Sequence, residues 1–174
     1  GDIMCDKLIF QNACICKAGH ICNDCTQLMP ELNYKFCNIC GEETVTHCSA
    51  CNTAIQGSLV RYDELFQQWS VEKSLNFEPA YCPECGTPFP WTQERLHAAQ
   101  GIIDMLDELS DEQKEELKKI IPDLTVERPR TQLSTLLFIK TFEKISGYGK
   151  EFLIKWLNDN AIATVLELLH KSNC

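Results

Sequence analysis

The sequence predicts a small, metal-stabilised α+β protein in which tandem zinc ribbons are followed by an α-helical C-terminal region. Two observations lead to this prediction. Eleven of the twelve cysteines lie in the first half of the chain, and the second half carries apolar residues at helical spacing. The 174 residues suffice for one domain or two small ones. We place the division between residues 1–91, the zinc-ribbon region, and residues 92–174, a helical region expected to mediate assembly or partner binding.

The first half is dominated by four Cys-x-x-Cys pairs: Cys22/Cys25, Cys37/Cys40, Cys48/Cys51 and Cys82/Cys85. Two sulfurs at this spacing on a tight turn can both bind one tetrahedral metal ion at about 2.3 Å. Gly41 and Gly86 follow two of the pairs and permit the left-handed backbone that directs N–H groups at the thiolates. A single pair is weak evidence because redox motifs share it, whereas several in succession indicate structural zinc.

The clearest ligand set is Cys48, Cys51, Cys82 and Cys85, which predicts a ribbon with four thiolates. Between its two halves, residues 58–62 have the pattern of a short strand and residues 63–69 that of a helical turn. Such an insertion is tolerated because each doubling of a loop costs only about 0.6 kcal/mol.

A second ligand set contains Cys37 and Cys40, and two pairs compete to complete it. Cys16 and His20 flank a plausible turn at Ala18-Gly19 and are favoured on geometry, although His20 could be an ordinary surface histidine. The alternative pair, Cys22 and Cys25, leaves only eleven residues before Cys37 and therefore a cramped loop.

A third metal site could be formed by Cys5, Cys14, Cys22 and Cys25. Interleaved with the second set, it would make a cross-brace, and the segment from Cys16 to Cys25 looks like the core of a RING finger. It departs from that pattern because one residue separates His20 from Cys22 and because Cys14 is too close to Cys16. Two zinc ions are therefore expected, or three if this site forms.

Four aromatic residues are expected to form a hydrophobic platform around the metal sites: Phe36, Tyr81, Phe89 and Trp91.

The formal charge of the chain is −9, and residues 1–91 carry five Lys/Arg against eleven Asp/Glu. Since nucleic-acid affinity depends largely on cationic side chains, the acidic ribbon half argues against nucleic-acid binding. Residues 128–174 reverse the sign, with seven Lys/Arg against four Asp/Glu.

The chain has no run of eighteen apolar residues and no basic-then-apolar leader, so we expect neither a membrane span nor a signal peptide. Regularly spaced cysteines then indicate metal ligands rather than disulfides. A cytoplasmic location is the corresponding expectation.

Helices are predicted throughout residues 92–174. The first starts at the N-cap candidate Thr92 and runs to about residue 108, and the second starts at Ser110, with Gln113 completing a capping box, and stops at Pro122. A third covers about residues 131–145. Gly147 and Gly149 interrupt the pattern, and a final helix is expected over about residues 150–171.

The last two predicted helices are more apolar than their acidic neighbours can cover. A compact four-helix core, self-association, a groove for a partner and a membrane-lying helix pair are the alternatives. Lysines that could flank such a membrane-lying pair are Lys140, Lys144, Lys150 and Lys155.

Several strings along almost the whole chain resemble the uncharacterised bacterial zinc-ribbon family known as domain of unknown function 2321. They are Cys16-Lys-Ala-Gly-His20, Asn23-Asp24, Lys35-Phe-Cys-Asn-Ile-Cys-Gly41, Cys48-Ser-Ala-Cys51-Asn52, Ile55-Gln-Gly57, Tyr81-Cys-Pro-Glu-Cys-Gly86, Pro90-Trp-Thr92, Leu109-Ser-Asp-Glu and Pro129-Arg-Thr131. The resemblance implies that Cys16 and His20 are the partners of Cys37 and Cys40. The four cysteines of the third site and the insertion before Tyr81 do not match the family pattern. The family brings no known activity.

No catalytic constellation stands out, because the cysteines are better used as metal ligands and these suffice to close both favoured sites. We therefore expect a non-enzymatic adaptor or regulator that acts through protein–protein interaction, with a partner or a second copy bound by the C-terminal helices. One alternative is a RING-like module that recruits a conjugating enzyme, which requires zinc at Cys22 and Cys25. The other is nucleic-acid binding through the basic C-terminal helices.

Overall fold

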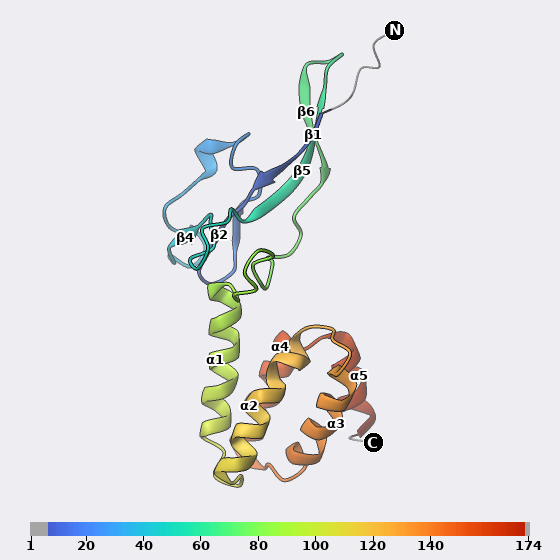
Figure 1. Ribbon diagram of the computed structural model, residues 1–174. Helices are drawn as coiled ribbons and strands as arrows, with labels where there is room; N and C mark the ends of the chain where they lie inside the picture. The colour runs from blue at the N-terminus through green and yellow to red at the C-terminus, as the bar shows by residue number, and fades with distance from the viewer. Residues whose placement is uncertain (1–6, 173–174) are drawn as a thin grey trace. The chain divides into compact units, whose positions relative to one another are not determined.

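The computed structural model describes residues 7–172, and within them it contains two small sheets and five α-helices (Figure 1). The predicted α+β class is confirmed at this level. The chain divides into two compact units, of which the first ends at Gln93 and the second begins at Glu94; the sequence prediction places this division after residue 91.

Both three-stranded sheets belong to the first unit and are antiparallel. One has the order β1-β5-β6 and the other the order β3-β2-β4. The strands are β1 (Lys7–Asn12), β2 (Cys14–Cys16), β3 (Ile21–Asn23), β4 (Thr44–Val45), β5 (Gln56–Asp63) and β6 (Gln68–Lys73), with a 3₁₀ turn η1 at Pro30–Leu32.

The predicted strand at residues 58–62 lies within β5, but the predicted helical turn at 63–69 is wrong. These residues form the turn and the start of the second strand of a β5–β6 hairpin. The Asp63 carboxylate accepts the N–H groups of Leu65 and Phe66 at 2.9 and 3.0 Å, which satisfies the donors of a tight turn without a helix. Across the hairpin the rings of Tyr62 and Trp69 lie 5.0 Å apart, a cross-strand pair that stabilises the sheet.

Strand β5 approaches the segment after β3 so closely that only glycine fits at position 57. A Cβ atom there would collide with the backbone oxygen of Asp24 and would lie 2.8 Å from that of Asn12. The next residue, Ser58, donates its N–H to the Asp24 oxygen at 2.9 Å and its hydroxyl to the Asp24 carboxylate. These contacts hold the chain beyond β3 against the larger sheet.

The core of the first unit is small. Its buried residues are Ala13, Ile15, Cys48, Ile55, Cys82, Phe89 and Trp91. The rings of Phe89 and Trp91 stack at 5.0 Å, and the Trp91 indole donates to the Pro79 oxygen at 2.8 Å. Of the expected aromatic platform these two residues are buried and Tyr81 is half-buried, but Phe36 is 54% exposed, so its inclusion was wrong.

Five helices follow: α1 (Pro90–Asp104), α2 (Asp111–Thr125), α3 (Thr131–Phe142), α4 (Gly147–Asn160) and α5 (Ala163–Ser172). The capping box at Ser110 and Gln113 is confirmed. The start at Thr92 and the stop at Pro122 were wrong: α1 begins at Pro90, and α2 continues past Pro122 to Thr125, with both Asp123 and Leu124 buried.

The single final helix predicted at about 150–171 is instead two helices that meet at Ala161–Ile162. At this break the N–H of Ile162 donates to the Leu124 oxygen of α2 at 3.0 Å. Gly147 has a φ of +65° and starts α4. The break at Ala161–Ile162 thus holds the start of α5 against α2.

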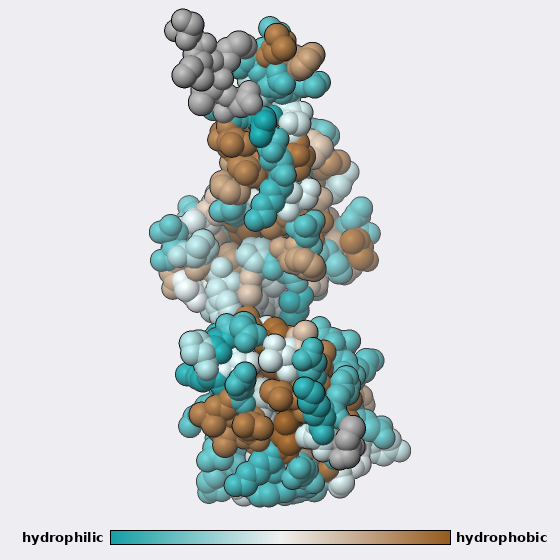
Figure 2. All heavy atoms as spheres, turned by 90° about the vertical axis from the view of Figure 1, so that its right-hand side faces the viewer, coloured by the Kyte–Doolittle hydropathy of each residue, from teal (hydrophilic) through white to brown (hydrophobic). Residues whose placement is uncertain are grey.

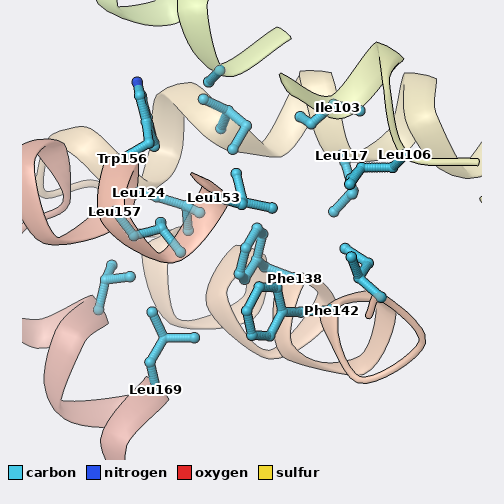
Figure 3. Close-up of a cluster of buried hydrophobic side chains, with 14 of the residues drawn as sticks. Ile103, Leu106, Leu117, Leu124, Phe138, Phe142, Leu153, Trp156, Leu157 and Leu169 are labelled. Carbon is cyan, nitrogen blue, oxygen red and sulfur yellow. The ribbon is translucent and has the colours of Figure 1, made fainter. Parts of the chain in front are cut away.

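These helices enclose a core of their own, shown in Figure 3, to which Leu117, Phe138, Leu153 and Leu157 contribute. Beside it lies a buried carboxylate, that of Asp123. Ser134 donates to it at 2.8 Å, and the guanidinium groups of Arg130 and Arg128 lie 2.7 and 3.4 Å away. The α2–α3 connection is thus fixed by polar contacts as well as by apolar packing.

Part of the predicted apolar surplus is buried and part is not. Leu133, Leu136 and Leu137 of α3 are 61%, 57% and 47% exposed, and Tyr148 and Phe152 of α4 are 81% and 58% exposed. Figure 2 shows apolar side chains on the surface of the helical unit. None of the helices within residues 7–172 is both long enough and apolar enough to cross a membrane.

Replacing Gly57 by alanine is expected to destabilise the first unit by about 3 kcal/mol, since the new methyl group meets backbone atoms that cannot rotate away. Gly101→Ala is the matched control: its Cβ meets nothing within 4 Å, and within α1 the change should stabilise the helix by about 1 kcal/mol. Urea unfolding of both variants measures the difference. Equal stability of Gly57→Ala and the wild-type protein would contradict the close approach of β5 to Asp24.

Candidate metal centres

The β2–β3 hairpin presents Cys16 and His20. Cys16 ends β2, and the turn that follows is closed by a bond from the Gly19 N–H to the Cys16 oxygen at 2.8 Å and one from the Cys16 N–H to the His20 oxygen at 3.0 Å. Gly19 has a φ of +95°, which a β-carbon would disfavour. The turn leaves both side chains on one side of the hairpin, within 3.5 Å of each other.

The pair Cys37/Cys40 lies on a knuckle, a tight turn built around the Cys-x-x-Cys spacing. In this knuckle the N–H of Gly41 donates to the Cys37 oxygen at 2.8 Å, and Gly41 has a φ of +79°. A β-bridge between Phe36 and Glu43 closes the turn. The knuckle is tied to the hairpin by Lys17, whose ammonium group lies 2.6 Å from the Glu43 carboxylate.

The hairpin and knuckle bring four ligand atoms together, so the expected set Cys16, His20, Cys37 and Cys40 is one cluster. The Cys16 sulfur lies 3.5 Å from His20 Nδ1 and 3.7 Å from the Cys40 sulfur, and the Cys37 sulfur lies 3.7 Å from the same nitrogen. A tetrahedron with metal–sulfur bonds of about 2.3 Å has edges of about 3.8 Å. The cluster could hold one metal ion.

A second cluster contains Cys48, Cys51, Cys82 and Cys85. Each of its two knuckles repeats the same bond from the fifth N–H to the first oxygen, at 2.9 Å, with Asn52 and Gly86 at φ values of +60° and +70°. Across the cluster the sulfurs of Cys48 and Cys85 are 3.7 Å apart and those of Cys51 and Cys82 are 3.6 Å apart. These distances also fit one tetrahedral metal ion, and they are far longer than a disulfide bond of about 2.05 Å.

Two threonines support the second cluster. The Thr53 hydroxyl lies 3.2 Å from the Cys51 sulfur and the Thr87 hydroxyl 3.3 Å from the Cys85 sulfur. Both threonines follow the second cysteine of their knuckle by two residues. Neither was predicted from the sequence, although this repeated spacing was a signal that could have revealed them.

The surroundings stabilise several of the ligand thiolates. The side chain and then the backbone N–H of Thr87 lower the pKa of Cys85 to about 6, and Thr53 lowers the pKa of Cys51 in the same way. At Cys82 the N–H of Cys85 acts in the same sense, but burial and the adjacent thiols outweigh it and raise the pKa to about 11. Crowded thiols thus oppose one another's ionisation, and a bound cation would remove that conflict.

The cysteines expected to form a third site lie in different surroundings. The Cys22 sulfur is 3.5 Å from the His20 oxygen, and its pKa is raised to about 12 by burial and by the neighbouring Cys37. Cys25 is buried beside Asp24 and Ser58, and Cys14 is buried in β2. Within residues 7–172, these three do not gather as a set of metal ligands. Cys5 lies outside the described residues, so the third site stays a prediction.

These features define an α+β protein with two four-ligand clusters in its first unit, each able to hold a metal ion. The chain belongs to the family described as an uncharacterized protein conserved in bacteria (DUF2321), whose family model matches residues 9–169. The resemblance seen in the sequence is therefore confirmed. No curated protein and no solved structure matches the chain.

Native mass spectrometry of the purified chain is expected to show two metal ions, and a Cys22→Ser/Cys25→Ser variant should retain both, because these sulfurs lie outside the two clusters. The matched Cys48→Ser/Cys85→Ser variant should lose one ion, since it removes two of the four ligands of the second cluster. Three ions in the wild-type protein that fall to two in Cys22→Ser/Cys25→Ser would instead establish the third site.

Proposed function

We propose that the protein is a non-enzymatic, cytoplasmic zinc-binding adaptor or regulator, in which two structural zinc ions build tandem ribbons and the helical unit binds other proteins. The observation that carries the proposal is that each cluster supplies four protein ligands. Catalytic zinc sites keep a coordination position open for water or substrate, whereas structural sites are closed.

The donor atoms support zinc as the metal. Seven thiolates and one imidazole make up the two clusters, and soft sulfur donors in tetrahedral arrangement favour zinc over hard cations such as magnesium or calcium. The ten cysteines described are all free, which is consistent with a reducing compartment such as the cytoplasm.

The helical unit supports the interaction role. It has a well-packed core and yet exposes Leu133, Leu136 and Leu137 on a single helix. Exposed apolar patches of this kind commonly mark binding surfaces. The RING-like alternative needs metal at Cys22 and Cys25, for which the described residues offer no third ligand, and it therefore ranks lower, as does nucleic-acid binding for a chain of net charge −9.

Removal of zinc by a strong chelator is expected to unfold the first unit and to leave the helices folded, because structural zinc contributes about 10–16 kcal/mol to small metal-dependent folds. Metal analysis together with amide NMR spectra before and after chelation measures this. Retained dispersion of the β-strand signals in the metal-free protein would contradict a structural role.

The adaptor role predicts either self-association or a stable partner. Light scattering over a wide range of concentrations, combined with purification from the native bacterium, tests both. A monomer at every concentration that also purifies without a partner would contradict the role.

A further inference from the structure

A hollow lies between α2 and α3, with a volume of about 420 Å³. Residues on both helices and just beyond α3 line it: Gln113, Glu116, Lys119 and Ile120 from one side and Leu137, Lys140, Thr141 and Lys144 from the other. It is far from the metal ligands in the sequence and belongs entirely to the helical unit. None of the residues that line the hollow is a ligand of either metal cluster.

Leu137 and the half-buried Ile120 give the groove an apolar lining, and α3 carries two further exposed leucines outside that lining. Leu133, Leu136 and Leu137 are exposed by 61%, 57% and 47%, and their spacing places them on one face of α3. The same face continues into Lys140 and Lys144 at the next turns. The buried positions of α3, such as Phe138, lie on the opposite side, so the leucine face is surplus to the core.

The groove lining also carries a net positive charge, with Lys119, Lys140 and Lys144 against the carboxylate of Glu116. Lys119, Lys140 and Lys144 are exposed, and none of them forms an ion pair with any residue between 7 and 172. The neighbouring Lys118 contrasts with them, because its ammonium group lies 2.6 Å from Asp104 and 2.9 Å from Glu115. Lys140 could serve the C-terminal end of the α3 dipole, but this does not account for Lys119 on α2.

We infer that this groove binds an acidic, amphipathic α-helix of a partner protein. The inference rests on the proposed adaptor function and assigns it a surface and a class of partner. A groove between two helices receives the apolar face of a third helix, and α3 is about 18 Å long, which matches roughly three turns of such a helix. Acidic side chains flanking that face would meet the three lysines. A flat membrane would not fill the recess, and nucleic acid would leave the leucines uncovered.

The probe is a designed peptide of about 18 residues, with leucines at helical positions i, i+3, i+4 and i+7 and glutamates at most other positions. Fluorescence anisotropy with the full chain should detect binding of this peptide. Lys140→Glu/Lys144→Glu should weaken that binding at least about tenfold, and Leu137→Ser should do likewise, because both change the lining of the groove. Lys155→Glu/Lys171→Glu is the matched control, with the same change of charge on α4 and α5, and should change the affinity by less than about twofold. Circular dichroism verifies that each variant is folded.

The inference would be overturned by no binding of the acidic peptide, by equal binding of a scrambled peptide without the leucine face, or by equal losses in the groove and control variants. Stronger binding to anionic vesicles or to nucleic acid through the same lysines would also overturn it. If self-association or binding of a native partner persists in Lys140→Glu/Lys144→Glu, the groove is not the binding surface, and the proposed adaptor function is unaffected. The adaptor function itself fails only if the wild-type chain shows neither.

Discussion

We propose that the first unit depends on the coordination of metal ions by its two clusters of cysteine and histidine side chains. Its main apolar cluster is small, and two of its seven buried residues, Cys48 and Cys82, are themselves candidate ligands. A bound ion would therefore replace much of the hydrophobic burial that larger domains use. The knuckles, the hairpin turn at Gly19 and the two supporting threonines all serve to place sulfur and nitrogen atoms about 3.5–3.7 Å apart.

The helical unit is built on a different basis. Its core of aliphatic and aromatic side chains and the buried Asp123 network need no metal ion. In the proposed function the two units therefore have different roles: the first is held rigid by coordination, and the second combines a stable core with an exposed leucine face and neighbouring lysines. Such a division suits an adaptor in which the first unit presents a rigid surface and the helical unit binds other proteins.

Local spacing in the sequence was enough to predict the cluster of Cys48, Cys51, Cys82 and Cys85 and most helices. Cys-x-x-Cys pairs and the Ser110 capping box are local signals, because a few neighbouring residues determine each turn. Where tertiary contacts decide the outcome, prediction from spacing failed. Within the 63–69 segment, Gln68 and Trp69 pair with β5. Helix α2 continues past Pro122, and the residues that follow it are buried. The last predicted helix breaks where the N–H of Ile162 donates to the Leu124 oxygen of α2. Strand β1 went unpredicted because its partner β5 is more than forty residues away. The pairing of Cys16 and His20 with Cys37 and Cys40 was open on spacing alone and needed the family resemblance.

X-ray absorption at the metal edge of the purified protein would decide whether coordination holds the first unit together, because it reports the identity and distance of the donor atoms. We expect two separate zinc ions, one with three sulfur ligands and one nitrogen ligand and the other with four sulfur ligands. The metal–sulfur distances should be about 2.3 Å. A shell dominated by oxygen and nitrogen, or a protein that is folded without bound metal, would contradict a metal-built first unit.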